Sequence, residues 1–124
     1  MFKYAYVPSP GYDSTNNYNG NKDCWGPCTM FSATATSSPN NNPAADGMAS
    51  VLAHEIVEAG TDPQGNAWYD RSGYENGDKC AWTFGAQQYT STGAPYNVKI
   101  GSLNYLIQQN WLATASRNGC ALHA

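Results

Sequence analysis

A histidine and two glutamates lie within five residues of one another, in the run Ala-His-Glu-Ile-Val-Glu-Ala over residues 53–59. His54 and Glu58 are four residues apart, so on a helix they share a face and can bind one metal ion. Glu55 lies beside His54, where its carboxylate can take a proton from metal-bound water. A glutamate replaces the second histidine of the His-Glu-x-x-His helix of zinc peptidases. The pattern predicts a metal-dependent hydrolase, most simply a peptidase, with Glu55 as general base.

The third metal ligand must come from another part of the chain, because a catalytic zinc ion takes about three protein ligands and one water. The candidates are Asp62, Glu75 and Asp78. Asp62 ranks last, because Pro63 disfavours a helix that continues to that position. Asp78 ranks first, and Glu75 would orient or replace one of the other ligands. One histidine with carboxylates also suits iron or manganese, so we expect zinc or another divalent transition metal.

A purely structural role for this cluster is the alternative. Apolar residues on both sides of the motif favour burial of His54 or Glu58, and a buried carboxylate needs a partner. Arg71 and Lys79 are the basic residues between His54 and Lys99, so either of them could form a salt bridge with Glu58.

Composition indicates one small domain over residues 1–124. Charged residues make up 12% of the chain and the net charge is −3, so no basic patch for nucleic acid is expected. No apolar run of about 18 residues is present, which argues against a membrane span. The expected partners are a peptide or protein substrate, or a cell-wall glycan.

Four cysteines in a short chain predict two disulfides and an oxidising compartment, so we expect a secreted, extracellular protein. The Trp-Gly-Pro segment between Cys24 and Cys28 can turn the chain enough for a local bridge. Cys80 would then pair with Cys120. A zinc site is disfavoured, because Cys24-x-x-x-Cys28 lacks the usual two-residue spacing.

Hydrophobic periodicity predicts an α+β fold with long loops. Alternation favours strands over residues 2–7 and 80–84. A helix should begin at Asp46, as its N-cap, and end near Gly60. Apolar residues at helical spacing predict a second helix over 103–112, closed by Asn118-Gly119. The expected architecture is a small zincin-like domain in which two main helices pack on a short sheet, with two disulfides.

Aromatic residues offer a weaker signal for glycan binding. Trp68, Tyr69, Trp82 and Trp111 could each stack on a sugar ring, although core packing is the more common role for aromatic side chains in a small domain.

Several motifs together resemble the phosphate-induced, EXORDIUM-like family of secreted proteins. They are the stretch 46–63, Asn66-Ala-Trp-Tyr69, Glu75-x-x-Asp78-x-Cys80, Tyr96-Asn97, Cys24-x-x-x-Cys28 and Gln109-Asn110-Trp111. The likeness covers most of the chain and corresponds to the C-terminal half of the family's domain. It implies an apoplastic or cell-wall location, and the family's biochemical activity is not settled.

The resemblance also bears on the site and on the function. Plant members carry Asn at the position of Asp62, which argues against Asp62 as an essential ligand. The other positions of the site match the family: His54, Glu55, Glu58, Glu75 and Asp78. The alternative to the peptidase is a non-catalytic extracellular module that binds cell-wall glycan or a protein partner through its Tyr- and Asn-rich loops.

Overall fold

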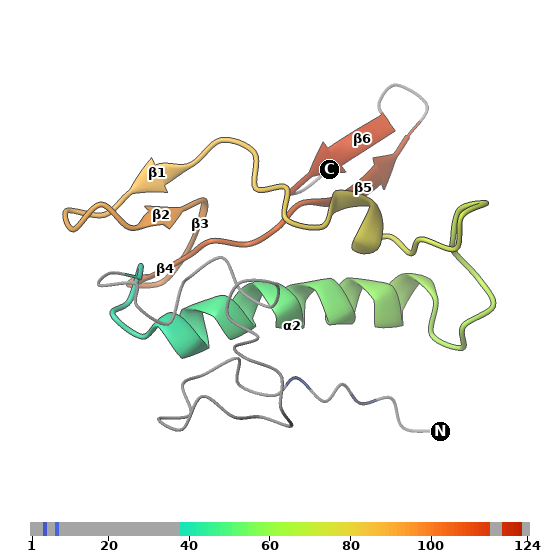
Figure 1. Cartoon of the computed structure of the whole chain (residues 1–124), viewed down its shortest axis with the longest axis horizontal. Helices are drawn as coiled ribbons and strands as arrows, with labels where there is room; N and C mark the ends of the chain where they lie inside the picture. The colour runs from blue at the N-terminus through green and yellow to red at the C-terminus, as the bar shows by residue number, and fades with distance from the viewer. Residues whose placement is uncertain (1–3, 5–6, 8–37, 115–117, 123–124) are drawn as a thin grey trace, which may run out of the picture.

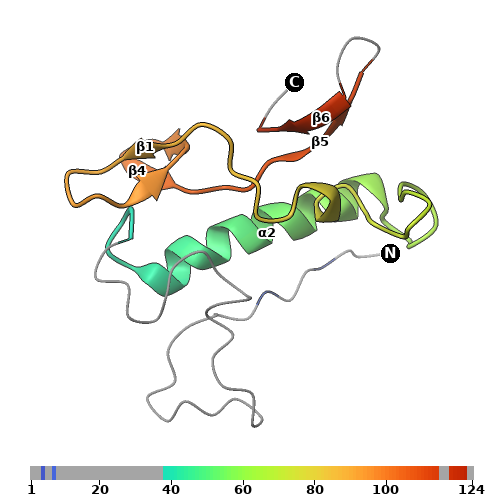
Figure 2. The same ribbon diagram turned by 45° about the horizontal axis from the view of Figure 1, so that its top comes forward.

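The computed structural model describes Tyr4, Val7 and residues 38–114 and 118–122. These residues form one long helix, α2 (Pro43–Thr61), one short 3₁₀ helix, η1 (Asp78–Cys80), and three antiparallel strand pairs (Figure 1). The strands are β1 (Gln88–Tyr89), β2 (Pro95–Tyr96), β3 (Val98–Ile100), β4 (Leu103–Tyr105), β5 (Asn110–Ala113) and β6 (Asn118–Ala121). Each strand pairs with the next along the chain, and all three pairs lie on the same side of α2 (Figures 1 and 2).

The ends of α2 follow from local sequence signals. Asn42 is the N-cap, and its side chain accepts a hydrogen bond of 3.2 Å from the Ala45 N–H, while Pro43 occupies the first helical position. The predicted N-cap, Asp46, is therefore wrong by about one turn. At the other end the helix stops at Thr61, one residue from the predicted end, and the Asp62 N–H donates to the Glu58 carbonyl at 2.7 Å.

Polar residues occupy the face of α2 that is turned toward the strands. Asp46, Ser50, His54 and Glu58 recur every four residues, and we call them the polar seam. Asp46, Ser50 and Glu58 are buried, whereas Leu52 and Ile56 on the same helix are 44% and 59% exposed. The usual amphipathic arrangement is thus reversed, and hydrogen bonds rather than apolar contacts hold this face of the helix.

The polar seam bonds both to the turn just before α2 and to a segment far away in the sequence. The Asp46 carboxylate accepts hydrogen bonds from the Asn40 N–H and the Asn40 side-chain amide, at 2.8 and 2.6 Å. The Ser50 hydroxyl accepts a bond of 2.9 Å from the backbone N–H of Gln108. Within the described ranges, the buried apolar residues are mostly small: Cys80, Ala94, Leu106 and Ala121. Much of the interior of this region is therefore a hydrogen-bonded layer between α2 and the strands.

Asparagine side chains join the strand pairs to the loops. The Asn97 amide donates to the carbonyls of Phe84 and Ile107, at 2.8 and 2.7 Å, and its oxygen accepts from the Ile107 N–H at 2.8 Å. Asn76 similarly bonds to the backbone of Trp111 on β5. These contacts fix loops that have little regular structure of their own.

The structure corrects the predicted fold class. Residues 103–112 form β4, an irregular segment and the start of β5, so the predicted second main helix is wrong. The predicted strand over 80–84 is also wrong, because η1 ends at Cys80 and turns follow it. The described part of the chain is one main helix beside three small antiparallel pairs, which is not the predicted zincin-like arrangement of two helices on a sheet.

Of the two predicted disulfides, the Cys80–Cys120 bridge is confirmed, with an S–S distance of 2.07 Å. It is the single bridge among the described residues. The predicted Cys24–Cys28 pair and most of the predicted strand over 2–7 lie outside those residues. None of the described helices has the length and apolar character that a membrane crossing requires.

Candidate metal site

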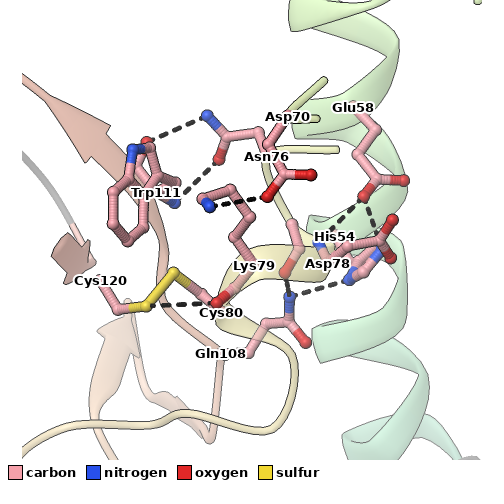
Figure 3. The surroundings of a disulfide bond; sticks show 11 residues. His54, Glu58, Asp70, Asn76, Asp78, Lys79, Cys80, Gln108, Trp111 and Cys120 are labelled. Atoms are coloured by element: carbon pink, nitrogen blue, oxygen red, sulfur yellow. Dashed lines mark hydrogen bonds and ion pairs between the residues drawn. A yellow bond between two sulfur atoms is a disulfide. The ribbon is translucent and has the colours of Figure 1, made fainter. Parts of the chain in front are cut away.

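His54, Glu58 and Asp78 come together at the C-terminal half of α2 (Figure 3). One potential ligand atom from each residue lies within 4.8 Å of the others. The His54 Nε2 atom is 2.9 Å from Glu58 Oε1 and 3.5 Å from Asp78 Oδ1. The spacing of four residues places His54 and Glu58 on one face, as predicted, and the loop before Cys80 supplies Asp78.

The backbone of η1 lies directly against the two helix side chains. The Asp78 N–H donates to Glu58 Oε1 at 3.2 Å, so this oxygen faces both the Asp78 amide and the imidazole. A Cβ atom placed on Gly77 would lie 2.9 Å from His54 Cγ and 3.0 Å from Glu58 Oε1. A glycine at this position is therefore what allows η1 to approach α2 so closely.

Gln108 sets the tautomer of His54. Its Nε2 atom lies 3.1 Å from the Gly77 carbonyl oxygen and 2.8 Å from His54 Nδ1. Because a carbonyl only accepts, the Gln108 amide nitrogen must be the atom that faces it, so the second N–H of this amide donates to His54 Nδ1. In the neutral imidazole the proton then lies on Nε2 and points to the Glu58 carboxylate.

Burial raises the pKa of Glu58 above its ordinary value. The nearby His54 works in the opposite direction, while the charges of Asp78 and Glu75 raise this pKa further. The Asp78 N–H bond lowers it by stabilising the carboxylate. Burial and the neighbouring acids outweigh the two favourable contacts, so a cation at this position would stabilise the ionised Glu58.

Glu75 and Asp62 flank the cluster without joining the set of close ligand atoms. Loss of solvent and the charges of Asp62 and Asp78 raise the pKa of Glu75. The Glu75 N–H donates to Asp78 Oδ2 at 3.1 Å, which leaves Asp78 Oδ1 turned toward His54. Asp62 Oδ1 accepts from the N–H groups of Asn66 and Ala67, at 2.7 and 2.8 Å. This use of Asp62 agrees with its low rank as a ligand.

Glu55 lies on an exposed part of α2, next to His54 in sequence. Its charge contributes to the raised pKa of Glu75, which places it near the acidic cluster. The residues that could hold a metal ion are therefore His54, Glu58 and Asp78, with Glu75 supporting Asp78 through its backbone.

The salt bridge from Glu58 to Arg71 or Lys79 that the alternative structural role requires is not formed among the described residues. Lys79 Nζ lies 2.9 Å from Asp70 Oδ2 and 4.5 Å from the centre of the Trp111 ring. This hydrogen bond lowers the pKa of Asp70. Lys79 thus neutralises a different carboxylate, and Glu58 faces His54 and the Asp78 amide instead.

The disulfide holds the loop that carries Asp78. Cys80 ends η1 and is fully buried, and its bridge to Cys120 ties η1 to β6 (Figure 3). The Cys80 N–H also donates to the Gly77 carbonyl at 3.0 Å. Asp78 is therefore fixed between a hydrogen bond to α2 and a covalent link to β6.

Two residues of this site, Gly77 and Gln108, were not predicted from the sequence. Gln108 is 54 residues from His54, so no local pattern links them. The glycine before Asp78 was a usable signal, because a glycine next to a candidate ligand suggests a close approach of the backbone.

With the geometry described, comparison with known proteins adds a decisive observation. The model of the phosphate-induced protein 1 conserved region matches residues 19–121. The chain belongs to this family. Protein EXORDIUM-like 3 from Arabidopsis thaliana is 40% identical over 87 residues, which are 60% of this chain and 26% of that protein. No solved structure matches the chain.

Family membership confirms the EXORDIUM-like resemblance and corrects the predicted function. Neither the family description nor the name of the relative describes a peptidase, and the fold is not the predicted zincin-like one. The predicted metal-dependent peptidase function is therefore wrong, and no general-base role for Glu55 is proposed. The matched region includes His54, Glu58 and Asp78, so the cluster belongs to the part of the chain that the family defines.

Proposed function

We propose that this chain is a non-catalytic extracellular binding module in which one divalent metal ion, held by His54, Glu58 and Asp78, fastens η1 to α2. The observation that carries this proposal is the convergence of three ligand atoms within 4.8 Å from two different elements. An ion at this point joins the helix to the loop that the disulfide already ties to β6.

The distances suit an ion after a small adjustment. Zinc bonds of about 2.0–2.2 Å in a tetrahedral site place neighbouring ligand atoms roughly 3.4 Å apart. The separation of 3.5 Å between His54 Nε2 and Asp78 Oδ1 already fits this value. The separation of 2.9 Å between His54 Nε2 and Glu58 Oε1 would have to widen by about 0.5 Å. One imidazole and two carboxylates also suit manganese or iron, so zinc serves as the first test ion.

The electrostatics favour an ion, and one hydrogen bond opposes it. An ion would offset the burial and acidic repulsion that raise the pKa of Glu58. It would also bind Nε2 of the neutral imidazole, so the single ring proton would move from Nε2 to Nδ1. The Gln108 amide would then turn over, so that its oxygen accepts a hydrogen bond from Nδ1–H, and would give up its bond to the Gly77 carbonyl. Because protons compete with the ion for the imidazole and the two carboxylates, we expect binding to weaken in acid.

Two observations support action outside the cell. The Cys80–Cys120 disulfide is typical of proteins that fold in an oxidising compartment. The EXORDIUM-like resemblance implies a cell-wall location, where a glycan or a protein would be the partner. The chain matches 26% of the length of its Arabidopsis relative, so these features of the longer protein enter here as part of the proposal.

Zinc titration of the disulfide-intact protein tests the proposal. Isothermal titration calorimetry should give about one zinc ion per chain. At a free zinc concentration of about 100 times the Kd, the free energy of unfolding should rise by about 2.7 kcal/mol. Glu58→Gln and Asp78→Asn should each lose most of this binding. Asp70→Asn is the matched control, because Asp70 pairs with Lys79 outside the cluster.

A parent protein that binds no zinc, manganese or iron ion would contradict the proposal. Equal zinc affinity in Glu58→Gln, Asp78→Asn and the control would also contradict it, because the ion would then lie elsewhere.

A further inference from the structure

Trp82 is exposed and holds an unusual backbone conformation. Its φ angle is +60°, and 46% of the residue's surface is exposed to solvent. Among the described residues other than glycine, Asn41 is the second with positive φ, and asparagine tolerates this conformation far better than a bulky aromatic residue. Burial alone does not explain why a tryptophan stands here, because nearly half of the residue faces solvent.

Hydrogen bonds hold the backbone around Trp82 on both sides. The Thr83 N–H donates to the Cys80 carbonyl at 3.0 Å, and the Thr83 carbonyl accepts from the Gln109 N–H at 2.7 Å. The next carbonyl, that of Phe84, accepts from the Asn97 side chain at 2.8 Å. Cys80 is in turn fixed by its disulfide. The loop is therefore stiff, and a ligand that contacts the indole would lose little loop entropy on binding.

The chain that follows η1 carries no charge as far as Val98. No acidic or basic residue occurs from Ala81 to Val98, and most of the residues over 81–93 are exposed. Their polar groups are hydroxyls and amides, and Tyr89 adds a second aromatic side chain that is 65% exposed. Uncharged hydrogen-bonding groups beside an exposed aromatic ring suit a neutral sugar, whose hydroxyls need such partners and whose ring presents apolar C–H groups.

From these observations we infer that the Trp82 loop, residues 81–85, is a binding site for a neutral polysaccharide, with the indole stacked on a pyranose ring. This inference rests on the proposed function, because it names the partner of the extracellular module. The strained conformation positions the indole for the ligand and not for the fold, which accounts for both the positive φ and the exposure.

Two substitutions separate the fold from the ligand. Trp82→Gly and Trp82→Asn place residues that accept positive φ, which offsets the loss of the covered part of the indole, so we expect each variant to melt within a few degrees of the parent. Each should bind insoluble neutral β-glucan, such as microcrystalline cellulose, about tenfold or more weakly than the parent in a depletion assay. Tyr69→Ala is the matched control, because Tyr69 is 56% exposed but lies beside the charged Asp70 and Arg71.

Acidic polygalacturonate and a proline-rich peptide complete the test. We expect weaker retention on polygalacturonate, since the net charge of −3 opposes binding to a polyanion. Three results would overturn the inference. They are a failure of the parent to be retained on the neutral glucan, a preference of the parent for the peptide or polygalacturonate, and Trp82 variants that bind the glucan as well as the parent does. Melting well below the parent in both variants would also overturn it, because the indole would then serve the fold.

Repeating the assay with EDTA and with Glu58→Gln distinguishes the two proposals. Glucan binding that depends on Trp82 but survives metal removal supports the inference even where zinc titration fails. Zinc binding without retention on the glucan rejects the inference alone.

Discussion

Gly77→Ala tests the close approach of η1 to α2 with one methyl group. The added Cβ would lie 2.9 Å from both Cγ and Nδ1 of His54 and 3.0 Å from Glu58 Oε1, distances that real Cβ atoms scarcely show. Either η1 or the two helix side chains must therefore move. The backbone itself is not the obstacle, because Gly77 has φ −67° and ψ −41°, which alanine adopts readily.

The expected magnitude follows from two opposing effects. Inserting a methyl group into a filled site costs about 1–3 kcal/mol. Replacing glycine also reduces the conformational entropy of the unfolded chain, which stabilises the folded state by about 0.4–1 kcal/mol. We therefore expect a net loss of about 1–2 kcal/mol, or a fall in Tm of roughly 4–8 °C for a domain of this size. Because His54 is displaced, zinc affinity should also fall.

The control is the same substitution at a glycine with open surroundings. Gly60 lies in the last turn of α2, and a Cβ there meets no heavy atom within 4 Å. Gly60→Ala should raise stability by up to about 1 kcal/mol. Urea unfolding of the parent and both variants, in EDTA, gives the comparison. Should Gly77→Ala prove as stable as Gly60→Ala, η1 does not lie against His54 and Glu58 as described.

Three further predictions concern the carboxylates and the disulfide. The raised pKa of Glu58 means that its contribution to stability is present below the unfolded value of 4.5 and is lost as the pH rises through the folded pKa. Metal-free Glu58→Gln should therefore be more stable than the parent at pH 7, and its free energy of unfolding should depend less on pH between these two pKa values. Equal pH profiles of the two proteins in urea unfolding would contradict this. Asp62→Ala should cost about 1–2 kcal/mol in thermal unfolding, because two N–H groups lose their acceptor, and should leave zinc affinity unchanged; a loss of zinc binding would make Asp62 a ligand. The Cys80–Cys120 disulfide closes a loop with a sequence separation of 40, and replacing both cysteines by alanine should cost about 4 kcal/mol of stability and weaken zinc binding. A variant that is as stable as the parent in calorimetric unfolding would contradict this.

The sequence predicted those features that depend on nearby residues. The spacing of His54 and Glu58 placed both on one face of a helix, and Pro63 marked its end to within one residue. The Asn42-Pro43 pair was a better start signal than Asp46, since asparagine caps a helix and proline suits its first position. Asp46 does not cap the helix, and its carboxylate instead bonds back to the preceding chain, at Asn40.

The second predicted helix failed because helical spacing of apolar residues outweighed a turn signal. Gly101 and Ser102 separate Ile100 from Leu103, and two residues that include glycine between apolar runs are typical of a β-hairpin. Gly101 indeed has φ +61°, and Ile100 pairs with Leu103. This turn requires the positive φ that glycine supplies, so it was the more informative signal.

The remaining site contacts join residues that are far apart in the sequence. Gln108 reaches both His54 and the Gly77 carbonyl because β4 and the segment after it pass over α2. The hydrophobic periodicity of the sequence gives no indication of such a long-range contact. The reversed helix face had the same effect, because the burial of Ser50 depends on a partner 58 residues away, at Gln108.

The polar seam also determines how α2 can dock. An apolar helix face can slide along its partner, because nondirectional contacts are nearly equivalent from one turn to the next. Here successive turns present an aspartate, a hydroxyl, an imidazole and a glutamate. Each faces a different partner: Asn40 before the helix, the Gln108 backbone, the Gln108 side chain and the Asp78 N–H. A shift of one turn, about 5.4 Å, would leave buried acids facing the wrong groups. These contacts hold the helix in a single register. In that register the ligand atoms of His54, Glu58 and Asp78 lie close together.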